Sequence, residues 1–85
     1  MDHCVIILFS IHYVLKAEKL LKEHGLAHDV VPVPREISSD CGMAIEFDGS
    51  HYQAIAGILK NSDINIARMY RKIGPRQFVE IAAYN

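Results

Sequence analysis

Residues 4–25 read CVIILFSIHYVLKAEKLLKEHG, a continuous apolar run followed by an amphipathic segment. The run is apolar at both parities, which is typical of a central strand that is covered on both faces. Ser10 can cap the helix that follows, whose apolar positions recur every three or four residues until Gly25 stops it. The stretch therefore predicts a buried strand and then a helix over 11–24, with Cys4 as a structural thiol of the core.

The later apolar patterns complete a recognisable order of elements. Strands are expected over 26–33, 43–47 and 65–73, a helix over 52–60, and a short helix in preference to an edge strand over 77–84. This order is the split βαβ pattern of a ferredoxin-like sandwich, a mixed α/β fold of the α+β type with a four-stranded antiparallel sheet and both helices on one face. We expect one ferredoxin-like domain over 1–85, with 75–85 as a C-terminal extension.

Composition argues against several classes of function. The 85 residues are 51% hydrophobic with a formal charge of −1, so nothing predicts disorder or a broad electrostatic attraction to nucleic acid or membrane. The two cysteines, Cys4 and Cys41, do not form a CxxC pair, the usual signature of zinc sites and redox dithiols. A reducing cytoplasm is the location that best fits this cysteine usage.

Residues 34–42 read PREISSDCG and connect the second and third expected strands. Pro34 removes a backbone donor, and the serines and the aspartate that follow favour turns over regular structure. The segment ends in Cys41 and Gly42, and a glycine beside the thiol can take positive φ and leaves room for a ligand or a partner's backbone. We interpret Cys41 as the candidate reactive thiol of the chain.

The expected topology brings this connection to the start of the first helix. The first strand ends, the first helix begins and the second strand ends at one edge of such a sheet, so Ser10 and His12 are expected within about 10 Å of the Cys41 sulfur. A helix N-terminus lowers a thiol pKa or holds an anionic sulfur species, and Arg35 acts in the same direction. Two carboxylates of the connection oppose this effect, which leaves the net pKa of the thiol open.

Two motifs carry a resemblance to a known family. They read SIHYVLKAEK over 10–19 and PVPREISSDCG over 32–42. Together with the apolar strand that follows, they resemble the Se/S carrier-like family of bacterial proteins, also called domain of unknown function 3343, over nearly the whole chain. The family's Ser-Thr-His pattern is matched except at Ile11, which stands in place of the threonine and removes one hydroxyl beside the expected site. The resemblance implies the family's fold and site and a role in carrying sulfur or selenium.

The function that the sequence favours is that of a carrier more than that of a stand-alone enzyme. In this interpretation the Cys41 thiolate accepts a sulfane sulfur or selenium atom from a donor protein's persulfide and passes it to an acceptor protein. Ser10, His12, Arg35 and Gly42 are the supporting residues. No cofactor, metal, nucleic acid or membrane is expected as a partner, and a homodimer is left open.

Three other interpretations compete with the carrier. A small regulatory or protein-interaction module would contain Cys41 only as an incidental loop thiol. A thiol enzyme or redox sensor would use His12 as its base. A metal site would combine Cys41 and His12 with His28 or His51, although these histidines lack the spacing of metal ligands.

Overall fold

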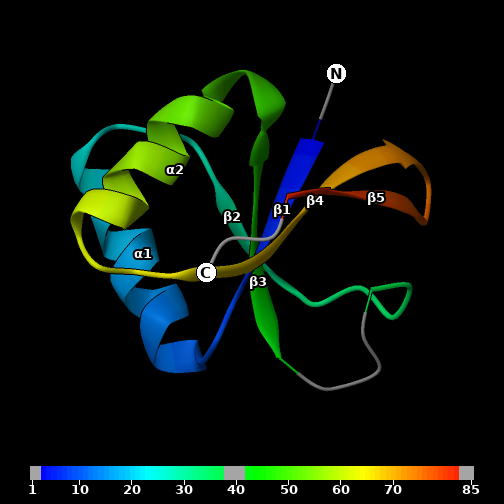
Figure 1. Cartoon of the computed structure of the whole chain (residues 1–85), viewed down its shortest axis with the longest axis horizontal. Helices are drawn as coiled ribbons and strands as arrows, with labels where there is room; N and C mark the ends of the chain where they lie inside the picture. Colours follow the sequence, from blue (N-terminus) through cyan, green and yellow to red (C-terminus); the bar gives the residue numbers. More distant parts are fainter. Residues whose placement is uncertain (1–2, 38–41, 83–85) are drawn as a thin grey trace.

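The computed structural model describes residues 3–37 and 42–82, and both helices lie on one face of an antiparallel sheet (Figure 1). The elements are β1 (His3–Leu8), α1 (Ile11–Glu23), β2 (Asp29–Pro32), β3 (Met43–Asp48), the 3₁₀ turn η1 (Gly49–His51), α2 (Tyr52–Asn61), β4 (Ile66–Gly74) and β5 (Gln77–Ala82). The strands lie in the order β2-β3-β1-β4-β5. The first four form the predicted ferredoxin-like arrangement, and β5 extends the sheet beyond the four strands that were expected.

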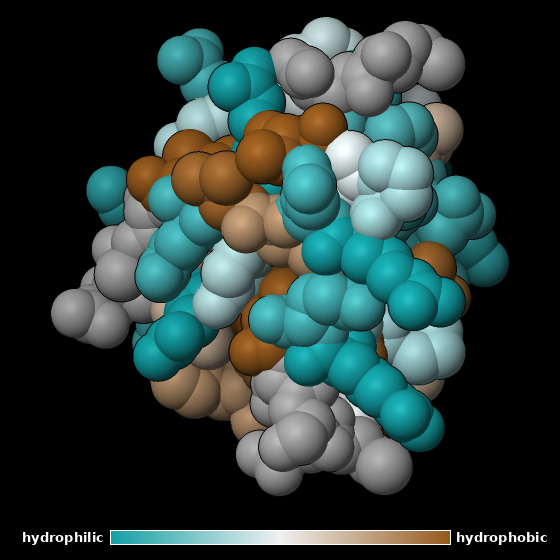
Figure 2. Space-filling model, turned by 90° about the vertical axis from the view of Figure 1, so that its right-hand side faces the viewer, coloured by the Kyte–Doolittle hydropathy of each residue, from teal (hydrophilic) through white to brown (hydrophobic). Residues whose placement is uncertain are grey.

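The predicted helix at the C-terminal end is wrong, because residues 77–82 form β5. Pro75 and Arg76 make a two-residue turn in which Arg76 has a φ of 78°, and Gln77 then pairs with Gly74. The chain reverses at this turn and β5 pairs along β4, which outweighs the weak helical spacing of three apolar residues. Figure 2 shows the side of the molecule on which this hairpin lies, with hydrophobic side chains gathered on the surface.

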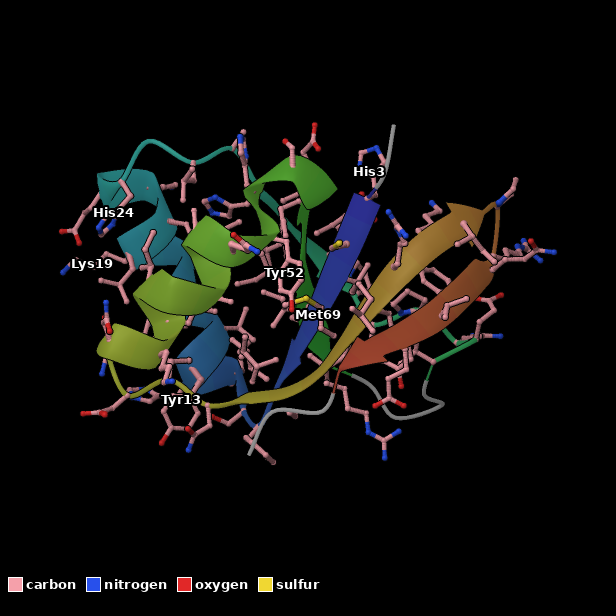
Figure 3. The ribbon with its side chains drawn as sticks, turned by 45° about the horizontal axis from the view of Figure 1, so that its top comes forward. His3, Tyr13, Lys19, His24, Tyr52 and Met69 are labelled. Atoms are coloured by element: carbon pink, nitrogen blue, oxygen red, sulfur yellow. The ribbon has the colours of Figure 1, made fainter. Side chains whose placement is uncertain are left out.

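The core lies between the sheet and the helices. The apolar face of α1 is buried and its charged face is exposed, as the spacing of its residues predicted. The buried residues are Val14, Ala17 and Leu21, and the exposed ones are Lys16, Lys19 and Glu23. Cys4 is 3% exposed in β1, as expected of a structural thiol. In Figure 3, Met69 and Tyr52 lie between α2 and the sheet, whereas Lys19 projects away from the molecule. Only residues 9 and 10 separate β1 from α1, so α1 begins at the end of β1.

The ends of α1 follow its capping residues. The Ser10 hydroxyl accepts the N–H of the third helical residue at 3.4 Å. Gly25 has a φ of 68°, and the Leu26 N–H donates to the Leu21 carbonyl at 2.9 Å, which closes the helix end. Because Leu26 is engaged in this way, β2 starts at Asp29 and is shorter than predicted. No helix of the described residues is long and apolar enough to cross a membrane.

Candidate functional site

Strand register places the start of α1 and the end of the β2–β3 connection at one end of the sheet. In the antiparallel pair β1–β3, Ile7 lies opposite Ala44, so the chain that leaves β1 toward Ser10 runs beside the chain that enters β3 from Gly42. The Val33 N–H donates to the Gly42 carbonyl at 3.0 Å and continues the β2–β3 ladder to the same point. The structure therefore brings Ser10 and Gly42 to the same end of the sheet.

Cys41 lies outside the described residues, together with residues 38–40. The predicted distance of about 10 Å from its sulfur to the first turn of α1 therefore stays a prediction. The described part of the connection, residues 33–37, runs out on the side of the sheet opposite to the helices (Figures 1 and 3). Arg35 belongs to this part of the chain and is exposed.

The first turn of α1 has the features of an anion-stabilising helix end. The first N–H groups of a helix have no partner within the helix, and Ser10 satisfies only that of Tyr13 through its side chain. The first turn contains no acidic residue that would cancel the partial positive charge of the helix. His12 is exposed on this turn, and its ring contacts that of Tyr13 edge to face at a centroid distance of 5.7 Å.

Three exposed apolar residues lie at this helix end. Phe9, Ile11 and Leu15 are 65%, 55% and 58% exposed, and we call them the Phe9–Leu15 patch. The helical spacing had placed Ile11 with the core residues of α1, and the structure corrects this. Ile11 and Leu15 are four residues apart and so lie on one side of the helix, displaced from its buried face. That offset was the signal in the sequence that could have revealed the patch.

The backbone at Gly42 does not depend on glycine. Gly42 does not have the positive φ that the sequence suggested, since among the described glycines only Gly25 has it. A Cβ atom on Gly42 would meet the Val33 Cγ2 atom at 3.7 Å, an ordinary van der Waals contact. Alanine therefore fits the local backbone, and any role of Gly42 lies in the space that it leaves beside Cys41.

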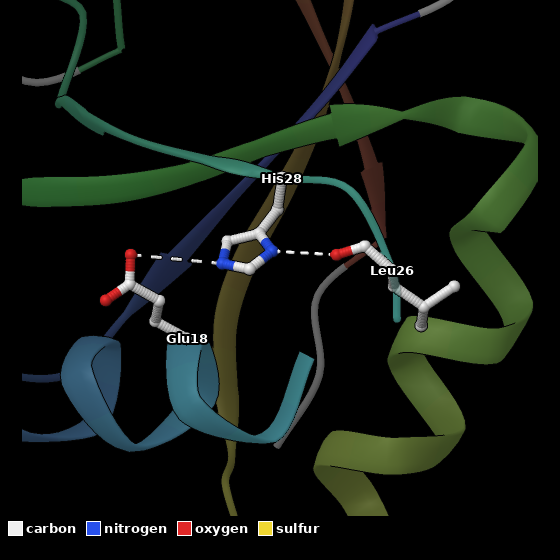
Figure 4. Close-up of polar contacts among 3 residues, drawn as sticks. All are labelled: Glu18, Leu26 and His28. Carbon is white, nitrogen blue, oxygen red and sulfur yellow. Dashed lines mark hydrogen bonds and ion pairs between the residues drawn. The ribbon is translucent and has the colours of Figure 1, made fainter. Parts of the chain in front are cut away.

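Of the three histidines considered as metal ligands, His12 lies at one end of the sheet and the other two lie at the opposite end. His28 precedes β2 and His51 follows β3, at the end away from Ser10 and His12. The His28 Nδ1 atom is 2.9 Å from the Leu26 carbonyl oxygen, and its Nε2 atom is 3.9 Å from a carboxylate oxygen of Glu18 (Figure 4). Among residues 3–37 and 42–82, no group of three histidine, cysteine, aspartate or glutamate residues could hold a metal ion. The contacts of His28 indicate a structural role.

Replacing His28 with alanine is expected to lower the free energy of unfolding by about 1–3 kcal/mol. The His28 side chain is only 5% exposed. Its Nδ1 atom donates a hydrogen bond to the Leu26 carbonyl oxygen, because a carbonyl oxygen can only accept one. The alanine variant therefore leaves this carbonyl without its donor. His24 makes the same bond to the Leu20 carbonyl at 2.9 Å but is exposed, so His24→Ala should change stability by less than about 0.5 kcal/mol. Urea unfolding followed by circular dichroism measures both, and equal effects would contradict the structural role.

Comparison with known proteins identifies the family. The family model described as "Putative Se/S carrier protein-like" matches residues 3–71. This range contains both sequence motifs, the first three strands and both helices, and it ends within β4, before β5. No curated protein and no solved structure matches the chain. Because the match covers most of its length, the chain belongs to the Se/S carrier protein-like family.

Proposed function

We propose that this protein carries sulfur or selenium on Cys41 between a donor protein and an acceptor protein in a reducing cytoplasm. The observation that supports the proposal most is the family match over residues 3–71, a range that includes Cys41 and both motifs. The other cysteine of the chain, Cys4, is buried in the core at 3% exposure. A partner protein has no access to Cys4 in the folded state, so the proposal assigns the transfer to Cys41.

The transfer needs one thiolate and involves no net oxidation or reduction. The Cys41 thiolate attacks the terminal sulfur of the donor's persulfide, an S–S bond to Cys41 forms, the donor's S–S bond breaks, and the donor cysteine leaves as a thiolate. In delivery, the acceptor's thiolate attacks the same terminal atom and Cys41 leaves as the thiolate. A terminal selenium atom follows the same course. The second thiol of each step belongs to the partner, so one reactive cysteine in this chain is sufficient.

The described surroundings of the site support this chemistry. The first turn of α1 supplies N–H groups and a partial positive charge at the end of the sheet where Gly42 enters β3. Such a helix end stabilises the Cys41 thiolate and the anionic terminal sulfur of a loaded carrier if the cysteine lies within reach. The imidazole of His12 is exposed on this turn, and its ring nitrogens can donate or accept a hydrogen bond there.

The Phe9–Leu15 patch supports docking of a partner protein. A carrier must hold its cysteine against a partner's active site for the duration of an exchange. The exposed apolar side chains at the start of α1 offer contact area for a partner, because a few well-placed residues provide most of the binding energy of an interface. The patch lies at the start of α1, at the end of the sheet reached by the chain on either side of Cys41.

Intact-mass spectrometry after incubation with a persulfide donor tests the proposal. The protein is mixed with a cysteine desulfurase and cysteine without reductant, and the expected product is one added sulfur atom that a reductant removes. Gly42→Ala keeps the local backbone, so slower loading of this variant would report reduced access to Cys41 and not unfolding. If no sulfur is added, the chain is an interaction module whose Cys41 has no transfer role.

Replacing Leu15 with glutamate is expected to slow sulfur transfer from the donor protein by about tenfold, because it places a charge in the docking patch. Loading from a small inorganic polysulfide should not change, since that reagent needs no docking surface. Ile73→Glu is the matched control: Ile73 is 59% exposed but lies near the opposite end of the sheet, in β4 beyond the pair His3–Lys72. If both variants slow the protein-mediated transfer equally, the patch is not the docking surface.

A further inference from the structure

The β4–β5 hairpin presents apolar side chains that the helices do not cover. Met69 of β4 is fully buried in the core, but Ile73 on the same strand is 59% exposed. Val79 lies opposite Arg71, two residues after Met69, and so belongs to the helix side of the sheet; it is 49% exposed. Ile81, two residues further on, is 38% exposed. Figure 1 shows the reason, because the hairpin extends away from both helices.

The two edges of the sheet are built differently. The edge strand β2 has four residues and ends at Pro32, with Pro34 close behind, and prolines block further strand pairing because they lack an N–H. The edge strand β5 has six residues, no proline and a single charged residue, Glu80. Natural proteins protect such an edge or pair it. Register shifts interrupt the pairing of β5 with β4, but no proline blocks the outer side of β5, and the apolar residues of the hairpin are uncovered. This edge is therefore open to pairing with another strand.

We propose that β5 pairs antiparallel with β5 of a second copy of this chain, with the two-fold axis at Phe78. In this register Phe78 lies opposite its counterpart and residues 77–79 of the two strands pair, while Arg76, in the turn just before β5, comes next to Glu80 of the other copy. Both charged residues are exposed, and Glu80 also interacts electrostatically with Arg68 of its own chain, so its carboxylate lies on a side of β5 that attracts cations. An axis at Glu80 would instead oppose two carboxylates, which disfavours pairing, and an axis at Val79 would pair no charges. Charge complementarity therefore selects the Phe78 register.

The geometry of the fold leaves space for this dimer. A two-fold axis perpendicular to the sheet makes one continuous sheet with the helices of both copies on the same side. Because the helices of each copy stop short of β5, their layers do not meet at the new junction. The exposed Val79 side chains of the two copies are brought close together on the helix side, which removes apolar surface from water.

The dimer and sulfur transfer are separate properties. The turn at 75–76 and β5 lie outside residues 3–71, which match the family, and the turn lies beyond the end of the sheet opposite to Ser10 and Gly42. Loss of the dimer should leave sulfur loading intact, and loss of loading in Cys41→Ser should leave the dimer intact. Sulfur transfer and the dimer are therefore tested by separate measurements, and either proposal can be wrong without the other.

Sedimentation equilibrium in the presence of reductant tests the dimer from about 10 µM to about 1 mM, the range expected for a small interface. The wild-type chain should dimerise, and Glu80→Arg and Arg76→Glu should each weaken the dimer by about tenfold to a hundredfold, because each replaces two attractions with two repulsions. An equimolar mixture of the two variants should dimerise again, since both charge pairs are then restored. The double variant Arg76→Glu/Glu80→Arg should dimerise alone.

Glu23→Arg, on the exposed face of α1, is the control for a change of net charge and should not alter the dimer. Circular dichroism verifies that each variant is folded. A wild-type chain that stays monomeric over the whole range overturns the proposal. A dimer that tolerates both charge reversals, or variants whose mixture does not reassociate, also overturns it, because the contact then lies elsewhere or in another register.

Discussion

Replacing Leu21 with alanine is expected to lower the free energy of unfolding by about 2–5 kcal/mol. Leu21 is fully buried and lies on the face of α1 that packs on the sheet together with Val14 and Ala17. The variant removes apolar surface from the core and leaves a cavity that the close-packed surroundings fill only in part. A domain of this size has a total stability of about 5–10 kcal/mol, so the change removes a large share of it.

Lys19→Ala is the matched control for Leu21→Ala, because Lys19 belongs to the same helix but is exposed. Alanine favours a helix at least as well as lysine, so this variant should change stability by less than about 0.5 kcal/mol. Urea unfolding of the three proteins gives the comparison. A midpoint of Leu21→Ala equal to that of wild type would contradict the burial of this face of α1 and with it the helix-on-sheet packing.

The elements predicted correctly from sequence are those whose signals are local. The burial of α1 follows from the spacing of its apolar residues, and its ends follow from Ser10 and Gly25, whose roles depend on neighbours within five residues. β5 was missed because its stability comes from pairing with β4. The apolar residues of 77–82 fit a helix as well as a strand when taken alone, and only the reversal at Pro75 and Arg76 makes β4 available.

The candidate site was predictable only as far as topology determines it. The order of the strands places Ser10 and Gly42 at one end of the sheet, and the β1–β3 register agrees. The path of residues 33–37 on the face opposite the helices was not predictable, because no periodic pattern governs a connection of this kind. The exposure of Ile11 was missed because Ile11 was grouped with the core positions of α1, although Ile11 and Leu15 lie on a side of the helix displaced from its buried face.

The two cysteines are expected to differ in reactivity toward iodoacetamide by about a thousandfold. Cys4 is 3% exposed in the central strand β1, so it reacts only when the fold opens. An opening that costs about 4 kcal/mol slows the labelling of Cys4 by about a thousandfold. Cys41 should react first, with a titration midpoint below the free-thiol value of about 8.5. Mass spectrometry of timed samples gives both rates, and equal labelling of the two cysteines would contradict the assignment.

Two variants examine how the surroundings of Cys41 act on its thiolate. His12→Ala and Arg35→Ala should each raise the midpoint of the labelling rate if these side chains stabilise the thiolate. Neither should abolish loading, because the N–H groups of the first turn of α1 remain. Residues 33–37 run on the face of the sheet opposite α1. An effect of Arg35 on the midpoint of Cys41 labelling would therefore act between residues of the connection and would not involve α1.

Cys41→Ser is expected to abolish sulfur loading completely, whereas Cys4→Ser should leave it intact, because a hydroxyl does not form a stable bond to sulfane sulfur and Cys4 is inaccessible in the folded state. Loss of loading alone does not distinguish a carrier from a redox sensor, since both need the same thiolate. The distinguishing measurement starts from the loaded wild-type protein, freed of donor and mixed with a second protein's thiol. A carrier passes the atom on, so the mass of one sulfur moves from this chain to the acceptor and Cys41 becomes free to load again. A sensor retains the modification until a reductant removes it, and that outcome would replace the carrier with a regulatory role for Cys41.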